Sequence, residues 1–184
     1  MHDETALNRD DTKASGALLI SEMILLTVFA LVSVAAKQMM RLDLNLPGHA
    51  YFLYIFFMVF GINYVPKKGA AVYMGVAAGI FAVISGSRKG IFDLLRYLIP
   101  ALCLEGVRLV PRLGHPLVNR VLEGLVLSLV MHGVKSGVNL VVGKPWELVV
   151  VKFYAGLVTY PIIGIFGGVC AWYMDRAVRR YKGV

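Results

Sequence analysis

The chain has 184 residues, of which 58% are hydrophobic and only 16% are charged, and its mean hydropathy is +0.71. Soluble domains are closer to half apolar and a quarter charged, so this composition excludes an ordinary soluble protein and predicts an integral membrane protein. The net charge of +8 comes without the basic-aromatic pattern of nucleic-acid binding, and we attribute it to loops and tails beside anionic membrane lipid.

The apolar stretches predict an all-α integral membrane protein, a bundle of about six transmembrane helices. We expect the helices at residues 16–38, 50–65, 69–85, 91–110, 122–142 and 148–174, within one domain of residues 16–176. Residues 1–15 are polar and are expected to form a mobile cytoplasmic tail, and residues 177–184 a basic cytoplasmic tail. Six spans place both ends on one side, and the excess of Lys and Arg there puts the N and C termini in the cytoplasm.

The first expected helix and the loop after it carry the first candidate residues. Ala30, Ser33 and Ala36 place small side chains along one side, where another helix can approach closely. The loop LDLNLPGH follows, with turn chemistry at Pro47 and Gly48. His49 ends this loop, and two interpretations stay open for it: an interfacial loop residue, or a group that covers a ligand.

The third and fourth expected helices differ in what their spacing predicts. Ala71, Gly75 and Gly79 recur every four residues in the third, which is typical of a close-packing edge. Asp93 and Arg96 lie three apart in the fourth, so the two side chains can pair on one face. This pair is either an interfacial ion pair or a ligand-facing one.

The fifth expected helix carries a polar stripe. Four polar residues interrupt its apolar sequence at spacings of four, three and four, namely Ser128, His132, Lys135 and Asn139. At a helical period they share one face. Histidine and lysine are costly inside a membrane, so the stripe indicates a functional site or a wet cavity. Alternatively, Lys135 and Asn139 extend to the interface near the helix end.

The last candidates lie at the start of the sixth expected helix. Trp146, in the linker GKPWE, is either an interfacial aromatic residue or a stacking wall above a pocket. Lys152 lies one turn into the helix. The expected substrate-binding residues, on an outward-open cavity, are His49, Asp93, Arg96, Ser128, His132, Lys135, Asn139, Trp146 and Lys152.

This layout resembles the substrate-binding S component of energy-coupling factor (ECF) transporters. The resemblance is carried by the LDLNLPGH loop, by AVYMGVAAGIFAVISG at 71–86 and by the polar stripe at 128–139. It implies a pocket formed by the last three helices and the loop between helices one and two, which captures a vitamin-like micronutrient. It also implies a transmembrane coupling subunit and two ATP-binding subunits as partners, in the cell membrane of a prokaryote. The family often carries an AxxxA pattern on helix one as its coupling contact, where this chain offers Ala30, Ser33 and Ala36.

The expected ligand is anionic or carbonyl-rich, because basic residues outweigh acidic ones at the expected site. We expect no enzymatic activity and no cofactor, and the nucleotide motif GxxxxGK[ST] is absent from the sequence. Two alternatives stay open. His49 and His132 would serve a metal or haem uptake subunit, and Ser128 and His132, one turn apart, would serve an intramembrane enzyme.

Overall fold

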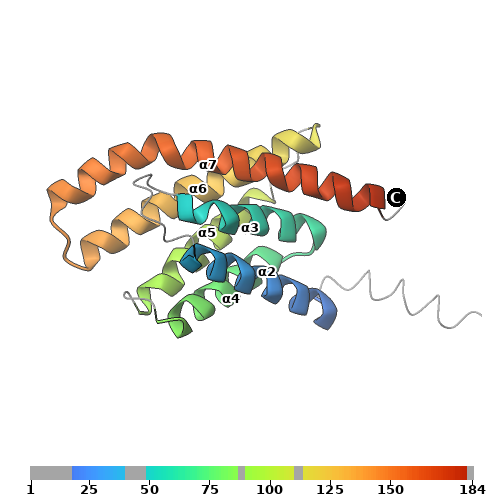
Figure 1. Cartoon of the computed structure of the whole chain (residues 1–184), viewed down its shortest axis with the longest axis horizontal. Helices are drawn as coiled ribbons and strands as arrows, with labels where there is room; N and C mark the ends of the chain where they lie inside the picture. Colours follow the sequence, from blue (N-terminus) through green and yellow to red (C-terminus); the bar gives the residue numbers. More distant parts are fainter. Residues whose placement is uncertain (1–17, 40–48, 87–89, 110–113, 182–184) are drawn as a thin grey trace, which may run out of the picture.

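The computed structural model describes residues 18–39, 49–86, 90–109 and 114–181 (Figure 1). Within these ranges it contains six α-helices and one short 3₁₀ turn, and no strand, which confirms the expected all-helical class. The elements are α2 (Ile20–Met39), η1 (His49–Tyr51), α3 (Phe52–Tyr64), α4 (Ala70–Ile84), α5 (Phe92–Val107), α6 (Pro116–Val141) and α7 (Trp146–Tyr181).

Three of these helices, α2, α6 and α7, are long and apolar enough to cross a membrane by length and composition. Two shorter apolar helices, α3 and α4, have 13 and 15 residues. At about 1.5 Å per residue they are shorter than a hydrocarbon core of about 30 Å.

Of the helix boundaries, the start of α6 and the end of α7 differ most from the sequence prediction. α6 begins at Pro116, where we expected a basic loop up to Arg120, and α7 continues to Tyr181, where we expected a tail from residue 177. The reason is that a run of apolar residues predicts only the part of a helix that is buried or faces lipid, and not its polar ends. These polar ends remain helical beside each other, where Arg120 of α6 pairs with Asp175 of α7 at 3.3 Å.

The hairpin of α6 and α7 is the largest helix pair, and Figure 1 shows the two lying antiparallel along one side of the bundle. Glycine makes this close approach possible. A Cβ on Gly124 would lie 2.3 Å from the carbonyl oxygen of Gly164, and one on Gly168 would lie 2.4 Å from that of Arg120. Any larger residue at these positions would push the two helices apart.

The small residues predicted on the first and third helices lie inside the bundle. Ala71 is fully buried, and α4 turns Gly75 and Gly79 toward Ala101 and Leu94 of α5. On α2, Ala30 and Ser33 are fully buried and Ala36 is half-buried. The side of α2 that is exposed carries large apolar residues instead, among them Ile20, Ile24, Val28, Leu31 and Val32.

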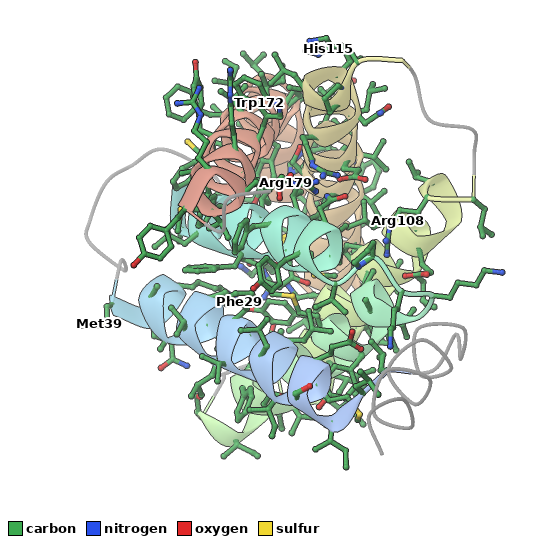
Figure 2. All side chains as sticks on the ribbon, turned by 90° about the vertical axis from the view of Figure 1, so that its right-hand side faces the viewer. Phe29, Met39, Arg108, His115, Trp172 and Arg179 are labelled. Atoms are coloured by element: carbon green, nitrogen blue, oxygen red, sulfur yellow. The ribbon has the colours of Figure 1, made fainter. Side chains whose placement is uncertain are left out.

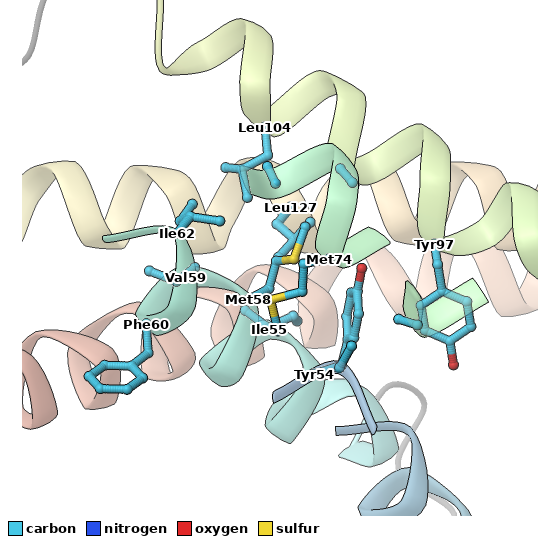
Figure 3. Packing of buried hydrophobic residues seen from close by; sticks show 14 of the residues in the cluster. Tyr54, Ile55, Met58, Val59, Phe60, Ile62, Met74, Tyr97, Leu104 and Leu127 are labelled. Carbon is cyan, nitrogen blue, oxygen red and sulfur yellow. The ribbon is translucent and has the colours of Figure 1, made fainter. Parts of the chain in front are cut away.

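The core is centred on α3, which packs against α2, α4, α6 and α7 (Figure 3). Its sequence FLYIFFMVFGINY is apolar on every side, as is typical of a helix surrounded by others. Tyr54, Met58 and Ile62 are fully buried there. The ring of Tyr54 meets that of Tyr97 from α5 edge-on, with centroids 4.9 Å apart.

The alternating helix directions give the bundle two ends. End A holds the C-termini of α2, α4 and α6 and the N-termini of α3, α5 and α7, and end B holds the opposite termini. In Figure 1 end A is on the left and end B, with the C-terminus of α7, is on the right. Figure 2 looks onto end B.

Candidate functional site

Charged and aromatic side chains from five elements converge on the ring of Tyr51 at end A. Tyr51 is the last residue of η1 and is only 5% exposed. The Nζ atoms of Lys37 and Lys135 lie 4.6 and 5.7 Å from the centre of its ring, and Cζ of Arg96 lies 5.8 Å from it. These are cation–π distances, each within about 6 Å. We call the set the tyrosine cluster; its members are Lys37, Tyr51, Asp93, Arg96, Tyr97, Lys135 and Tyr160.

Tyrosine hydroxyls accept hydrogen bonds from all three cations of the cluster. Lys37 Nζ donates to the hydroxyl of Tyr97 at 2.5 Å, and Lys135 Nζ donates to that of Tyr160 at 3.0 Å. Arg96 donates to the hydroxyl of Tyr51. Each hydroxyl accepts from one donor of a cation and carries no charge of its own.

Arg96 also donates to Asp93, three residues earlier on α5, and the two form the ion pair expected from their spacing. The described cluster thus holds three cations and one carboxylate, a balance of two positive charges. Lys37, Tyr51 and Lys135 have further interactions besides those given. Residues 40–48, which include Asp43, lie outside the described part of the chain.

His132 forms a wall beside the cluster. It is 3% exposed, and its ring stacks on Phe153 and Tyr160 with centroids 5.0 and 4.4 Å apart. Its Nε2 lies 2.9 Å from the carbonyl oxygen of Phe153. A Cβ on Gly156 would lie 2.0 Å from this ring, so glycine makes room for it. Among the described residues, the buried Nδ1 atom has no hydrogen-bond partner.

Ser128 lies outside the cluster, although it shares the polar stripe of α6. Its side chain is fully buried and donates to the carbonyl oxygen of Leu125 at 2.8 Å. It packs on α7, where a Cβ on Gly164 would lie 2.3 Å from its hydroxyl oxygen. His132 bonds to the backbone of Phe153 instead. Ser128 and His132 are therefore not hydrogen-bonded to each other in the structure.

The remaining predicted residues occupy varied positions. Trp146 is 67% exposed and Lys152 is also exposed, since it lies beside the buried line of α7 formed by Val149, Gly156 and Tyr160. Asn139 is buried one turn beyond Lys135. His49 begins η1, and its side chain lies outside what the structure describes. No group of three His, Cys, Asp or Glu able to hold a metal ion occurs among the described residues.

Sequence reasoning missed four members of the cluster: Lys37, Tyr51, Tyr97 and Tyr160. Lys37 lies near the end of the first helix, at the same end of the bundle as Arg96 and Lys135. This common location was the sequence signal that could have placed Lys37 in the site. The tyrosines gave no signal of their own, because aromatic residues are ordinary in membrane helices.

A hollow of about 470 Å³ lies between α6 and α7, and Phe153, which stacks on His132, is among its lining residues. It is mostly apolar, and its walls include Gly133, Gly137 and Trp146. The four-residue spacing of the two glycines is typical of close helix packing. In the structure nothing lies within 4 Å of a Cβ on either glycine, so they open space rather than close it.

End B buries charges of a different kind. Lys67 pairs with Glu22 at 3.0 Å, Arg108 with Glu105 at 3.7 Å, and Arg120 with both Glu123 and Asp175. Asn63 donates to Glu123 at 2.5 Å. Glu105 also accepts the backbone N–H groups of Gly69 and Ala71, where a carboxylate stabilises the N-terminus of α4.

No family model matches the chain, and neither a curated protein nor a solved structure matches it significantly.

Proposed function

We propose that the chain is the substrate-capture subunit of an ECF-type importer, and that it binds an anionic, vitamin-like micronutrient in the tyrosine cluster. The observation that carries this proposal is the convergence of Lys37, Arg96 and Lys135, from three helices, on one buried tyrosine ring. Three cations on apolar helices cost free energy, and proteins retain such groups where they serve a ligand or an ion path.

The chemistry of the cluster suits a carboxylate or a phosphate. Lysine and arginine form charge-assisted hydrogen bonds with these groups, which are roughly twice as strong as neutral ones. Aromatic rings surround these cations: the ring of Tyr160 lies 6.2 Å from that of Tyr51 and 4.4 Å from that of His132, measured between ring centres.

The elements that supply the cluster support the same proposal. Asp93 and Arg96 come from α5, Lys135 from α6 and Tyr160 from α7, which are the last three helices of the chain. Lys37 and Tyr51 lie on either side of residues 40–48, which connect α2 to η1 in the sequence. This is the set of elements from which the ECF resemblance builds its pocket.

In this proposal six helices cross the cell membrane of a prokaryote, with both termini in the cytoplasm. End A then faces outward, where a captured nutrient arrives, and end B faces the cytoplasm. Arg176, Arg179 and Arg180, near the end of α7, agree with the positive-inside rule.

The proposed partners are a transmembrane coupling subunit and two ATP-binding subunits. Ala30 and Ser33 are fully buried within the chain, so they are unsuited to an external contact. We assign the coupling contact to the exposed apolar face of α2, which includes Ile24, Val28 and Leu31.

Two lysines at end A allow a matched test of the binding site. The protein is purified in detergent, the co-purifying small molecule is identified by mass spectrometry, and its affinity is measured for Lys135→Gln and Lys152→Gln. Lys135→Gln removes a charged donor from the cluster, and we expect its affinity to fall about 10- to 100-fold, since such bonds contribute about 1.5–3 kcal/mol. Lys152→Gln loses the same charge from an exposed position, and we expect a change of less than about twofold.

Equal losses in the two variants would mean that only the overall charge of end A matters, and would contradict a site at the cluster. A protein that carries no ligand and shows no thermal shift with a panel of carboxylated and phosphorylated micronutrients would overturn the proposed function.

A further inference from the structure

A groove lies at end B between the start of α6 and the end of α7, at the opposite end of the bundle from the tyrosine cluster. Figure 2 labels Trp172 and Arg179, two of its lining residues. It encloses about 480 Å³. Its lining combines four arginines with one carboxylate and two apolar groups, namely Arg120, Arg176, Arg179, Arg180, Asp175, Pro116 and Trp172. Four arginines and one carboxylate line the groove, and the carboxylate of Glu123 lies directly beside Arg120, which leaves two more positive than negative charges in this group.

The base of the groove is held in place by ion pairs. Arg120 is 7% exposed and lies 3.7 Å from Glu123 and 3.3 Å from Asp175. Asp175 also accepts a hydrogen bond from Arg179 at 3.1 Å. The single carboxylate of the lining is therefore shared between two arginines, while Arg176 and Arg180 add exposed positive charge at the rim.

The rim also carries an aromatic side chain. The guanidinium of Arg176 lies over the ring of Trp172, with Cζ 5.4 Å from the ring centre. Stacking of this kind holds the planar guanidinium in position, and a guanidinium presents a fork of donors that fits the oxygens of a phosphate. Trp172 and Pro116 add apolar surface next to the charges.

The length of α7 places this groove at the depth of lipid headgroups. α7 has 36 residues, and at about 1.5 Å per residue it is about 54 Å long, against a hydrocarbon core of about 30 Å. One part of the helix must therefore extend beyond the hydrocarbon, and the polar sequence from Asp175 onward is suited to do so. Trp172 stands at this boundary, as tryptophan does in membrane proteins.

We propose that this groove binds the headgroup of an anionic phospholipid, with its phosphate on Arg176 and Arg180 and its upper acyl chain against Trp172 and Pro116. The inference uses the proposed membrane location but not the proposed micronutrient. Basic groups near a membrane surface each contribute about 1 kcal/mol to the attraction of anionic lipid.

The test is native mass spectrometry of the full chain in detergent, titrated with phosphatidylglycerol or with phosphatidylcholine of the same acyl chains. We expect one phosphatidylglycerol to be retained in preference to phosphatidylcholine. The double variant Arg176→Gln, Arg180→Gln is expected to bind it at least tenfold more weakly, since two interfacial charges are lost. The control Lys144→Gln, Lys152→Gln removes two exposed charges at end A, and less than a twofold change is expected.

Equal retention of the two lipids, or equal losses in the two double variants, would overturn the inference, as would unchanged binding in the arginine variant. Displacement of the lipid by millimolar inorganic phosphate would reassign the groove to a free anion, and displacement by an acidic peptide to a protein partner. If circular dichroism shows that the double variant does not fold, the single variant Arg180→Gln is used instead. We expect it to bind phosphatidylglycerol severalfold more weakly, and unchanged binding would overturn the inference.

The two proposals are separable by one variant. Lys135→Gln is expected to leave phosphatidylglycerol binding unchanged. Selective lipid binding in a protein that binds no micronutrient would contradict the proposed function and leave this inference standing.

Discussion

The two ends of the bundle both hold charged side chains, and the described contacts around those charges differ. At end B, Lys67, Arg108 and Arg120 each lie within 4 Å of a carboxylate. At end A, the three cations of the tyrosine cluster bond to tyrosine hydroxyls, and Asp93 is the single carboxylate among its described members.

This difference separates charges that hold the fold from charges suited to a ligand. A carboxylate beside an arginine satisfies both its donors and its charge, so removing that carboxylate leaves a buried cation uncompensated. A tyrosine hydroxyl satisfies a donor but carries no negative charge, so an anionic ligand can add an interaction that the hydroxyl does not supply. End B should therefore respond to mutation mainly in stability, and end A mainly in binding.

The largest effect on stability is expected from Glu123→Ala at end B. Glu123 is 5% exposed, accepts a hydrogen bond from Asn63 and pairs with Arg120. Its loss should lower the free energy of unfolding by about 3 kcal/mol, because two buried polar partners are left behind. Unfolding in mixed micelles measures this value, and Glu147→Ala, an exposed acidic residue at end A, is the control. Equal stability of the two variants would remove the contrast between the ends.

An intermediate effect, on affinity rather than stability, is expected from Tyr51→Phe at end A. The change keeps the ring under the cations and removes only the hydroxyl that accepts from Arg96. We expect about tenfold weaker ligand binding, because the hydroxyl positions the guanidinium of Arg96 for the ligand, and a stability loss of about 1 kcal/mol, the usual contribution of one hydrogen bond. Calorimetric titration tests this, with Tyr154→Phe, which is 67% exposed, as the matched control. A destabilised variant with undiminished affinity would assign Tyr51 to the fold.

The smallest effect is expected from Glu22→Gln at end B. Glu22 and Lys67 are 3.0 Å apart, but both side chains are partly exposed. Such pairs contribute about 0–1 kcal/mol, and salt screens them. Glutamine keeps an acceptor for the backbone N–H of Leu19, so the helix start is preserved. Unfolding at about 0.1 M and 1 M salt should show a difference from wild type that shrinks as salt rises. A loss above about 2 kcal/mol at both salt concentrations would place this pair with the buried network.

For the candidate site, periodicity within one helix predicted more than any other sequence signal. The spacing of Asp93 and Arg96 predicted their pair, and the polar stripe of α6 predicted that His132, Lys135 and Asn139 turn inward, where all but Lys135 are below 10% exposed. Ser128 shares that face but packs against Gly164 of α7. One face of a long helix can pack on a neighbouring helix near its start and line the cluster further along.

Residues that meet from different helices were beyond this kind of reasoning. Lys37 and Tyr97 are 60 positions apart and share a hydrogen bond, and Lys135 and Tyr160 do so across the α6–α7 hairpin. Tyr51 is central only because η1 places it between α2, α5 and α6. Lys152, by contrast, is basic and lies on α7, the helix that supplies Tyr160, but its side chain is exposed.

The sequence by itself determined the helical class, the number of helices and the inward face of α6, since these depend on composition and on the 3.6-residue period along one helix. The tertiary structure alone decided which charged side chains meet partners from another helix, as Lys37 meets Tyr97 and Arg120 meets Asp175. Which side chains meet depends on the distances between helices. For α6 and α7, which supply His132, Lys135 and Tyr160, the close approaches at Gly124, Gly156 and Gly168 set this distance. Those distances arise from contacts between residues far apart in the chain, and the local sequence pattern of one helix does not predict them.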